Sequence, residues 1–173
     1  TDKNTVSYVW KLNDVVQSET GATFTGEVST DGDYTVTVVA VDAAKNKSEG
    51  RSISWELDTT KPEIVKFEGN RTAGEKTNDK TFSFTVEATD KNTVSYIWKL
   101  NDVVQSETGA TFTGEVSEDG DYTVTVVAVD AAENESESRF VGWEYDSTKP
   151  TVELTCSNEI GEGGKFLCSK LKP

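Results

Sequence analysis

The chain has 173 residues, of which 34% are hydrophobic and 9% aromatic, which is enough apolar material for one or two folded domains. Acidic residues outnumber basic ones by 31 to 17, and the net charge of −14 makes a nucleic-acid partner improbable because phosphates are repelled. The sequence contains no histidine, the commonest general base and zinc ligand, and no catalytic fingerprint, so we expect no enzymatic activity. It has no run of about 18 or more apolar residues and no charged-then-apolar leader near Thr1, so we expect neither membrane insertion in this stretch nor an export signal at its start.

The chain contains an internal repeat, in which two long stretches have nearly the same sequence. At an offset of 88 residues, Thr1–Asp58 aligns with Thr89–Asp146, and nine of the 58 aligned positions differ. A period of this length exceeds the roughly 20–50 residues of a solenoid repeat and suits an independently folding sandwich of about 100 residues. The repeat therefore predicts domains that follow one another like beads on a string.

Two copies of a proline-containing linker set the boundaries of the unit. The first reads Asp-Thr-Thr-Lys-Pro and ends at Pro62, and the second reads Asp-Ser-Thr-Lys-Pro and ends at Pro150. Proline lacks a backbone donor and fixes φ, which stiffens a junction and keeps the strands on its two sides from merging into one sheet. We therefore predict an incomplete unit at residues 1–58, a complete unit at 59–146 and the opening strands of a further unit at 147–173.

Apolar and polar residues alternate with a period of two through the chain, which predicts an all-β fold. In the complete unit, Asn101-Asp102 is expected to turn the chain after the third strand. The less regular stretch at 103–117 is expected to hold one or two short strands. The other strands predicted for this unit are 63–67, 81–88, 94–100, 122–129 and 139–145.

Two aromatic positions indicate an immunoglobulin-like β-sandwich. Trp98 lies in the middle of the third predicted strand, where such folds bury a tryptophan, and Tyr122 opens the next long strand as the tyrosine of a tyrosine corner does. The first copy repeats them as Trp10 and Tyr34. We interpret all four as structural packing residues and not as a platform for stacking a ligand.

The chain resembles the Ig-like repeats of large secreted adhesins and other bacterial cell-surface proteins in two stretches, GDYTVTVVAVDAAKNKSE and WELDTTKPEI, and the resemblance covers residues 1–150. It implies tandem Ig-like domains on the cell surface, non-enzymatic and structural or adhesive in role. The chain departs from this family at Lys45 and Glu133, which stand where the family usually has glycine in the loop before the last strand.

The two cysteines of the chain, Cys156 and Cys168, lie twelve positions apart near the C-terminus. A cysteine pair alone in an acidic chain without methionine is read more easily as a disulfide than as half of a zinc site. We predict that they are bonded to each other, which favours an oxidising, extracellular compartment.

Calcium is the one metal for which the sequence places suitable oxygen ligands at positions that an Ig-like fold would bring together. In an Ig-like sandwich, the second-to-third-strand loop, the loop before the last strand and the entering linker lie at one pole, and carboxylate and amide oxygens suit calcium. The alternative is that aspartate and asparagine stand here as ordinary turn residues. The candidate ligands of an interdomain calcium ion are Asp58 in the linker, Asp90 and Asn92 in the first loop, and Asp130 and Asn134 in the second.

Three functions fit these observations. The chain is expected to be a stalk or spacer of Ig-like domains, partnered by neighbouring domains of the same chain. Alternatively, it is a subunit of an extracellular filament, in which the opening strands at the end of one chain complete the incomplete unit at the start of the next. A glycan-binding accessory module is a distant third. The sequence does not identify a host or surface ligand.

Overall fold

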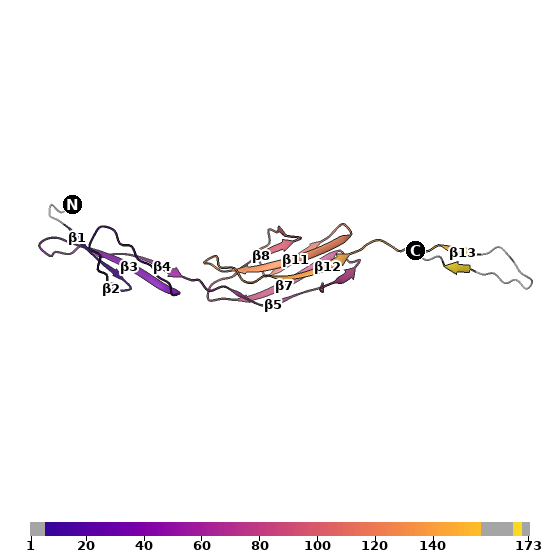
Figure 1. Cartoon of the computed structure of the whole chain (residues 1–173), viewed down its shortest axis with the longest axis horizontal. Helices are drawn as coiled ribbons and strands as arrows, with labels where there is room; N and C mark the ends of the chain where they lie inside the picture. Colours follow the sequence, from indigo (N-terminus) through magenta and orange to yellow (C-terminus); the bar gives the residue numbers. More distant parts are fainter. Residues whose placement is uncertain (1–5, 157–167, 171–173) are drawn as a thin grey trace, which may run out of the picture.

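The computed structural model describes residues 6–156 and 168–170, and every regular element in them is a β-strand. A four-stranded sheet, a sandwich and a short hairpin follow one another along the long axis (Figure 1). No helix of the described residues is long and apolar enough to cross a membrane. The first sheet has the order β2-β1-β3-β4, with β1 at Ser7–Leu12, β2 at Val15–Val16, β3 at Gly32–Val41 and β4 at Arg51–Leu57.

The second unit forms a sandwich of two antiparallel layers, joined by a short parallel strand at one edge. This confirms the predicted all-β, Ig-like sandwich. One layer has the order β10-β7-β5, with β5 at Glu63–Gly69, β7 at Thr81–Thr89 and β10 at Thr111–Glu115. The other has the order β6-β12-β11-β8-β9, with β6 at Glu75–Thr77, β8 at Ser95–Leu100, β9 at Val103–Val104, β11 at Gly120–Val129 and β12 at Arg139–Tyr145.

The core lies between these two layers because successive side chains of a strand point to opposite faces. Phe82 and Phe84 of β7 are buried from one side, and Val124 and Val126 of β11 are buried from the other. Trp98 of β8 lies among them and is 0% exposed. Because the core has no disulfide, close packing of these side chains holds the two layers together.

The crossing from one layer to the other was missed in the sequence. After β5 the chain turns at Gly74, whose φ of 75° is a conformation that glycine adopts without strain, and β6 then pairs in parallel with β12. The buried guanidinium of Arg71 donates hydrogen bonds to the carbonyl oxygens of Asp79 and Thr81 and so fixes this crossing. A strand of three residues is too short to show alternation, so only its pairing with β12 defines β6.

Two tight turns use left-handed backbone conformations. Asn101 and Asp102, at the predicted turn, have φ angles of 47° and 64° and join β8 to β9, as in a hairpin turn with positive φ at both central residues. In the loop before β12, Glu133 has a φ of 68°, and Lys45 has a φ of 67° in the first copy. A side chain with a Cβ is strained there, which explains why glycine suits these two positions.

This strain predicts that Glu133→Gly stabilises the second unit by about 1 kcal/mol, because glycine removes the left-handed penalty. The melting temperature should rise by roughly 4–8 °C for a domain of this size. Glu133→Ala is the control, since it removes the same carboxylate and keeps the strain. Equal melting temperatures for the two variants would show that charge, and not backbone strain, is responsible for any gain.

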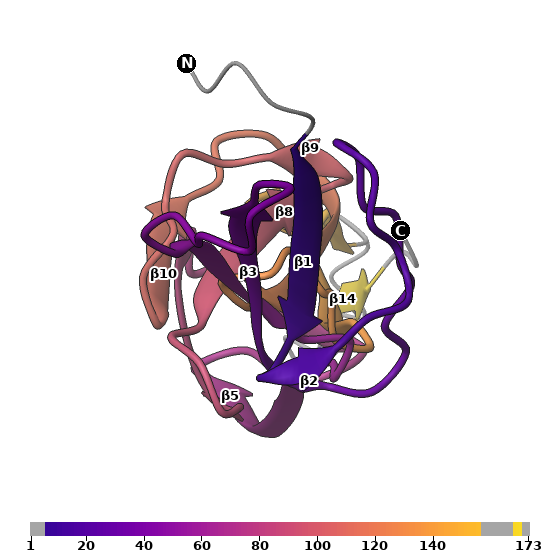
Figure 2. The same cartoon turned by 90° about the vertical axis from the view of Figure 1, so that its left-hand side faces the viewer.

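The N-terminal sheet repeats β8, β9, β11 and β12 in the same order and register, with β1 pairing β3 as β8 pairs β11. Viewed from its end of the molecule, this sheet lies in front of the sandwich (Figure 2). Residues 23–27 have the same sequence, Thr-Phe-Thr-Gly-Glu, as the strand β10, but they form no strand. In the second unit β10 pairs with β7, and no counterpart of β7 accompanies the first sheet among the described residues.

The C-terminal hairpin consists of β13 at Leu154–Cys156 and β14 at Cys168–Lys170, and the backbone places Cys156 directly opposite Cys168. The two side chains lie outside what the structure describes, so the disulfide stays a prediction. The residues between the two strands are also outside the described part.

Candidate functional site

The linker between the first two units is held by the unit that precedes it. The Asp31 carboxylate accepts hydrogen bonds from the Thr59 backbone N–H at 3.0 Å, from the Thr59 hydroxyl at 2.8 Å and from the Thr60 hydroxyl at 2.7 Å. The hydroxyls of Thr60 and Thr59 lower the pKa of Asp31, so the carboxylate stays charged. Asp119 holds the second linker in the same way, through Ser147 and Thr148.

The same linker is also held by the unit that follows it. The side-chain amide of Asn92 donates to the Asp58 carboxylate, and that of Asn134 donates to the Asp58 backbone carbonyl at 3.0 Å. Lys91 forms an ion pair with Glu56 of β4, and this bond is the main cause of the raised pKa of Lys91. The linker is therefore bonded to both units, and the ion pair between Lys91 and Glu56 joins the two units directly. A bend at the linker would break several of these bonds.

Three carboxylates from different segments meet at this junction. One oxygen from each of Asp58, Asp90 and Asp130 lies within 4.8 Å of the other two. Asp130 is 5% exposed, and Oδ2 of Asp90 is enclosed yet accepts no hydrogen bond from the residues that the structure describes. An enclosed carboxylate oxygen without a donor costs free energy, and a cation bound there would offset that cost.

Hydrogen bonds determine the charge of the most buried member of the cluster. Burial raises the pKa of Asp130, but the side-chain and backbone amides of Asn134 and the backbone amide of Ala132 outweigh it and lower that pKa overall. Asp130 is therefore a carboxylate at neutral pH. Both predicted amide ligands, Asn92 and Asn134, present nitrogen and not oxygen to the carboxylates. An amide rotation of about 180° would exchange the two atoms.

The four aromatic residues singled out in the sequence lie in the sheets. Trp98 donates from its indole Nε1 to the carbonyl of Gly109 at 2.9 Å, and Trp10 repeats this bond to Gly21 at the same distance. The hydroxyl of Tyr122 donates to the carbonyl of Glu118 at 2.8 Å, which is the geometry of a tyrosine corner, and Tyr34 does the same with Thr30 at 2.6 Å. None of the four forms a flat exposed platform with the others.

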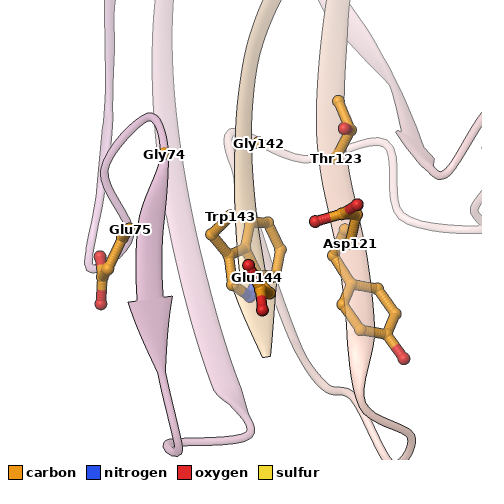
Figure 3. A pocket seen from close by; sticks show the side chains of 8 residues that line it. Gly74, Glu75, Asp121, Thr123, Gly142, Trp143 and Glu144 are labelled. Carbon is orange, nitrogen blue, oxygen red and sulfur yellow. The ribbon is translucent and has the colours of Figure 1, made fainter. Parts of the chain in front are cut away.

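A separate surface hollow of about 260 Å³ lies between β6 and the strands β12 and β11 (Figure 3). Its carboxylates come from Glu75, Asp121 and Glu144, and the carboxylate of Glu144 is bound to the ammonium of Lys76. No histidine, serine or cysteine lines the hollow. The hollow is thus lined mainly by carboxylates, together with the side chains of Thr123, Tyr122 and Trp143.

Sequence reasoning missed Asp31 and Lys91 as junction residues. The repeat could have indicated Asp31, because Asp31 and Asp119 occupy the same position in the two copies. Each lies two residues before an aspartate–tyrosine pair, and each precedes a Ser/Thr-rich linker by the same number of residues. Lys91 carries no such signal, since its partner Glu56 comes close only when the two units are folded and joined.

The comparisons with known proteins agree with this architecture. Residues 65–142 match the model of the PKD domain. This PKD match begins in β5 and ends in β12, so it spans the sandwich between its first and last strands. The PKD domain is a non-catalytic module typical of extracellular and surface proteins.

Among solved structures, the fibronectin(III)-like modules of Clostridium thermocellum CbhA are similar to this chain, with a TM-score of 0.47 and 16% sequence identity. The alignment covers 84% of this chain and 80% of that chain. No curated protein sequence matches the chain. The PKD match supports the predicted resemblance as far as an Ig-like β-sandwich module.

Proposed function

We propose that this chain is a spacer segment of an extracellular surface protein, in which Ig-like units are joined end to end by linkers that resist bending. The observation that carries the proposal is the linker at residues 58–60, which donates hydrogen bonds to Asp31 on one side and accepts them from Asn92 and Asn134 on the other. A flexible tether between independent domains has no need of such contacts. A stalk that must hold a distant group away from a surface does.

The same junction is the place where calcium would act. Asp58, Asp90 and Asp130 come from three segments, and a divalent cation between them would bind the linker to both loops of the second unit. Three carboxylates this close repel one another, and the net charge of −14 adds to that repulsion. Lys91 lies near enough to offset part of the charge of Asp58, so calcium would strengthen a junction that already forms without it.

Extracellular modules bind calcium with dissociation constants of about 0.1–1 mM. With a dissociation constant near 0.1 mM, about 1 mM calcium would stabilise the second unit by roughly 1.4 kcal/mol. The expected result is a rise in melting temperature of roughly 5–10 °C. In parallel, small-angle X-ray scattering should show that calcium increases the average maximum dimension of the molecule and narrows the range of dimensions that it adopts.

Asp90→Asn should abolish both calcium effects and raise the calcium-free melting temperature slightly, because the amide keeps the shape of the side chain and removes one of the three carboxylates that repel one another. Asp102→Asn is the matched control, since it removes one carboxylate from an exposed turn at the other end of β8. If calcium shifts neither the melting temperature nor the scattering profile of the unaltered chain, the metal does not act here. A junction that stays extended under those conditions would still support the spacer.

A further inference from the structure

Three asparagines stand in the acceptor sequence for N-linked glycans, which is Asn-X-Ser/Thr with X other than proline. They are Asn46, Asn70 and Asn134, and they differ in the residue that lies two positions before the asparagine. That residue is Glu68 for Asn70 and an alanine for the other two. Bacterial oligosaccharyltransferases, the enzymes that attach such glycans, select acceptors with an acidic residue at this position. Asn70 therefore has the full bacterial acceptor sequence, Glu-Gly-Asn-Arg-Thr, and the other two asparagines do not.

The fold leaves the side-chain nitrogen of Asn70 free to carry a sugar. Asn70 is exposed and follows β5 directly, at the start of the turn that leads to β6. Its Oδ1 accepts a hydrogen bond from the backbone N–H of Ser83 at 2.8 Å, and its Nδ2 donates none to the residues that the structure describes. A bond from Nδ2 to a sugar leaves the amide oxygen and one N–H in place. The contact with Ser83 is therefore kept when Asn70 is modified.

The other two asparagines use the same nitrogen to hold their surroundings together. Nδ2 of Asn134 donates to the Asp130 carboxylate at 2.8 Å and to the Asp58 carbonyl oxygen at 3.0 Å. Both of its N–H groups are thus engaged, so a glycan there would break a contact of the junction. Nδ2 of Asn46 donates to the Asp42 carboxylate at 2.8 Å.

The surface beside Asn70 has room for the first sugar of a glycan. A hollow of about 410 Å³ lies there, and the residues that line it are Glu68, Gly69, Asn70, Ser83 and Thr85. Ser83 and Thr85 alternate along β7 with the buried Phe82 and Phe84, so their hydroxyls are on the outer face of the sandwich. Hydroxyl and carboxylate groups of this kind can form hydrogen bonds with the hydroxyls of a sugar.

We propose that Asn70 is an acceptor site for an N-linked glycan, which an oligosaccharyltransferase attaches while the chain is exported. The new bond joins Nδ2 of Asn70 to the anomeric carbon of the first sugar, and the amide gives up one proton. The bond that breaks is the one between that carbon and the polyprenyl diphosphate that carries the glycan. Such a modification requires export of the chain, which agrees with the extracellular location typical of PKD modules, and it does not depend on a spacer role.

Arg71, the middle residue of the acceptor sequence, determines when the transfer takes place. Its side chain is 6% exposed and donates to the carbonyl oxygens of Asp79 and Thr81. A transferase has to draw the acceptor segment into its own active site, and the segment cannot leave the surface while this side chain is buried. Transfer therefore precedes the closing of the turn, and the glycan remains outside after folding.

The test exports the full chain from a bacterium that contains an oligosaccharyltransferase and its lipid-linked glycan. Mass spectrometry should show one glycan per chain, on the peptide that contains Asn70. Asn70→Asp should carry no glycan, and its carboxylate keeps an oxygen for the Ser83 amide. Glu68→Gln should also carry none, because the acidic residue of the acceptor sequence is lost.

A matched pair at Thr72 controls for damage to the fold. Thr72→Ala should remove the glycan and Thr72→Ser should retain it, since serine also completes the acceptor sequence. The chains with and without the glycan should have the same melting temperature, because no hydrogen bond is lost. A chain without a glycan, a glycan on Asn46 or Asn134 in place of Asn70, or equal modification of Glu68→Gln would overturn the proposal. Purified, folded chain should not be modified by the same transferase, and efficient transfer to it would contradict the role of Arg71.

Discussion

Replacing Trp98 with alanine is expected to lower the free energy of unfolding of the second unit by about 3–5 kcal/mol. The Trp98 side chain is fully buried, and its ring lies 5.4 Å from that of Phe112 and 6.2 Å from that of Phe67. Alanine leaves a cavity among these rings, and the carbonyl of Gly109 loses its donor. Urea unfolding, read by hydrogen exchange of the buried amides of β11, measures this loss.

The repeat supplies the control for this experiment in the same molecule. Trp10 has the equivalent neighbours in its own unit, including Phe24 and the carbonyl of Gly21, but no second layer covers it among the described residues. Trp10→Ala is expected to change the stability of the second unit by less than about 0.5 kcal/mol, because distant sites add independently. If both substitutions reduced the protection of β11 equally, the two units would not be separate folding units.

Arg71→Ala is expected to destabilise the second unit by about 2–4 kcal/mol. Arg71 is 6% exposed and donates to the carbonyl oxygens of Asp79 and Thr81, and its guanidinium lies 2.8 Å from the Asp79 carboxylate and 3.2 Å from that of Glu75. Without the guanidinium, the carbonyl oxygens lose their donors and the crossing from β5 to β6 loses its anchor. Chemical unfolding measures the loss, and Arg71→Lys, which keeps the charge but not the planar fork, should lose an intermediate amount.

The titration of Asp79 gives a second measurement of the same contact. The backbone amide of Thr81 and the Arg71 side chain lower the pKa of Asp79 to about 2 from its ordinary value of 3.8. Because the folded-state pKa is the lower one, the charged form stabilises the fold above about pH 4, and this contribution is lost as the pH falls toward 2. In Arg71→Ala, NMR titration should show the Asp79 pKa move back toward 3.8. An unchanged pKa together with unchanged stability would remove Arg71 as the anchor.

Much of the candidate junction follows from chain order, and part of it does not. Asp90 and Asp130 directly follow β7 and β11, which run to the same pole of the sandwich, and Asp58 lies in the linker that enters at that pole, so their proximity is a consequence of topology. The orientation of the amides of Asn92 and Asn134 depends on which neighbours donate and accept, which chain order does not reveal. The same is true of Lys91, since its partner belongs to the other unit.

The sequence by itself indicated the longer strands of the second unit and their inward positions, because a period of two is a property of residue order, and the repeat of 88 residues predicted the unit boundaries. Only the tertiary structure decided which segments find a partner strand and therefore form a strand themselves. Thr-Phe-Thr-Gly-Glu is the strand β10 at residues 111–115, where β7 offers its edge, and is no strand at residues 23–27, where no such edge is present among the described residues. The reason is physical: a strand is stabilised by hydrogen bonds and side-chain contacts with its neighbour, so the same five residues form it only where a neighbour supplies them.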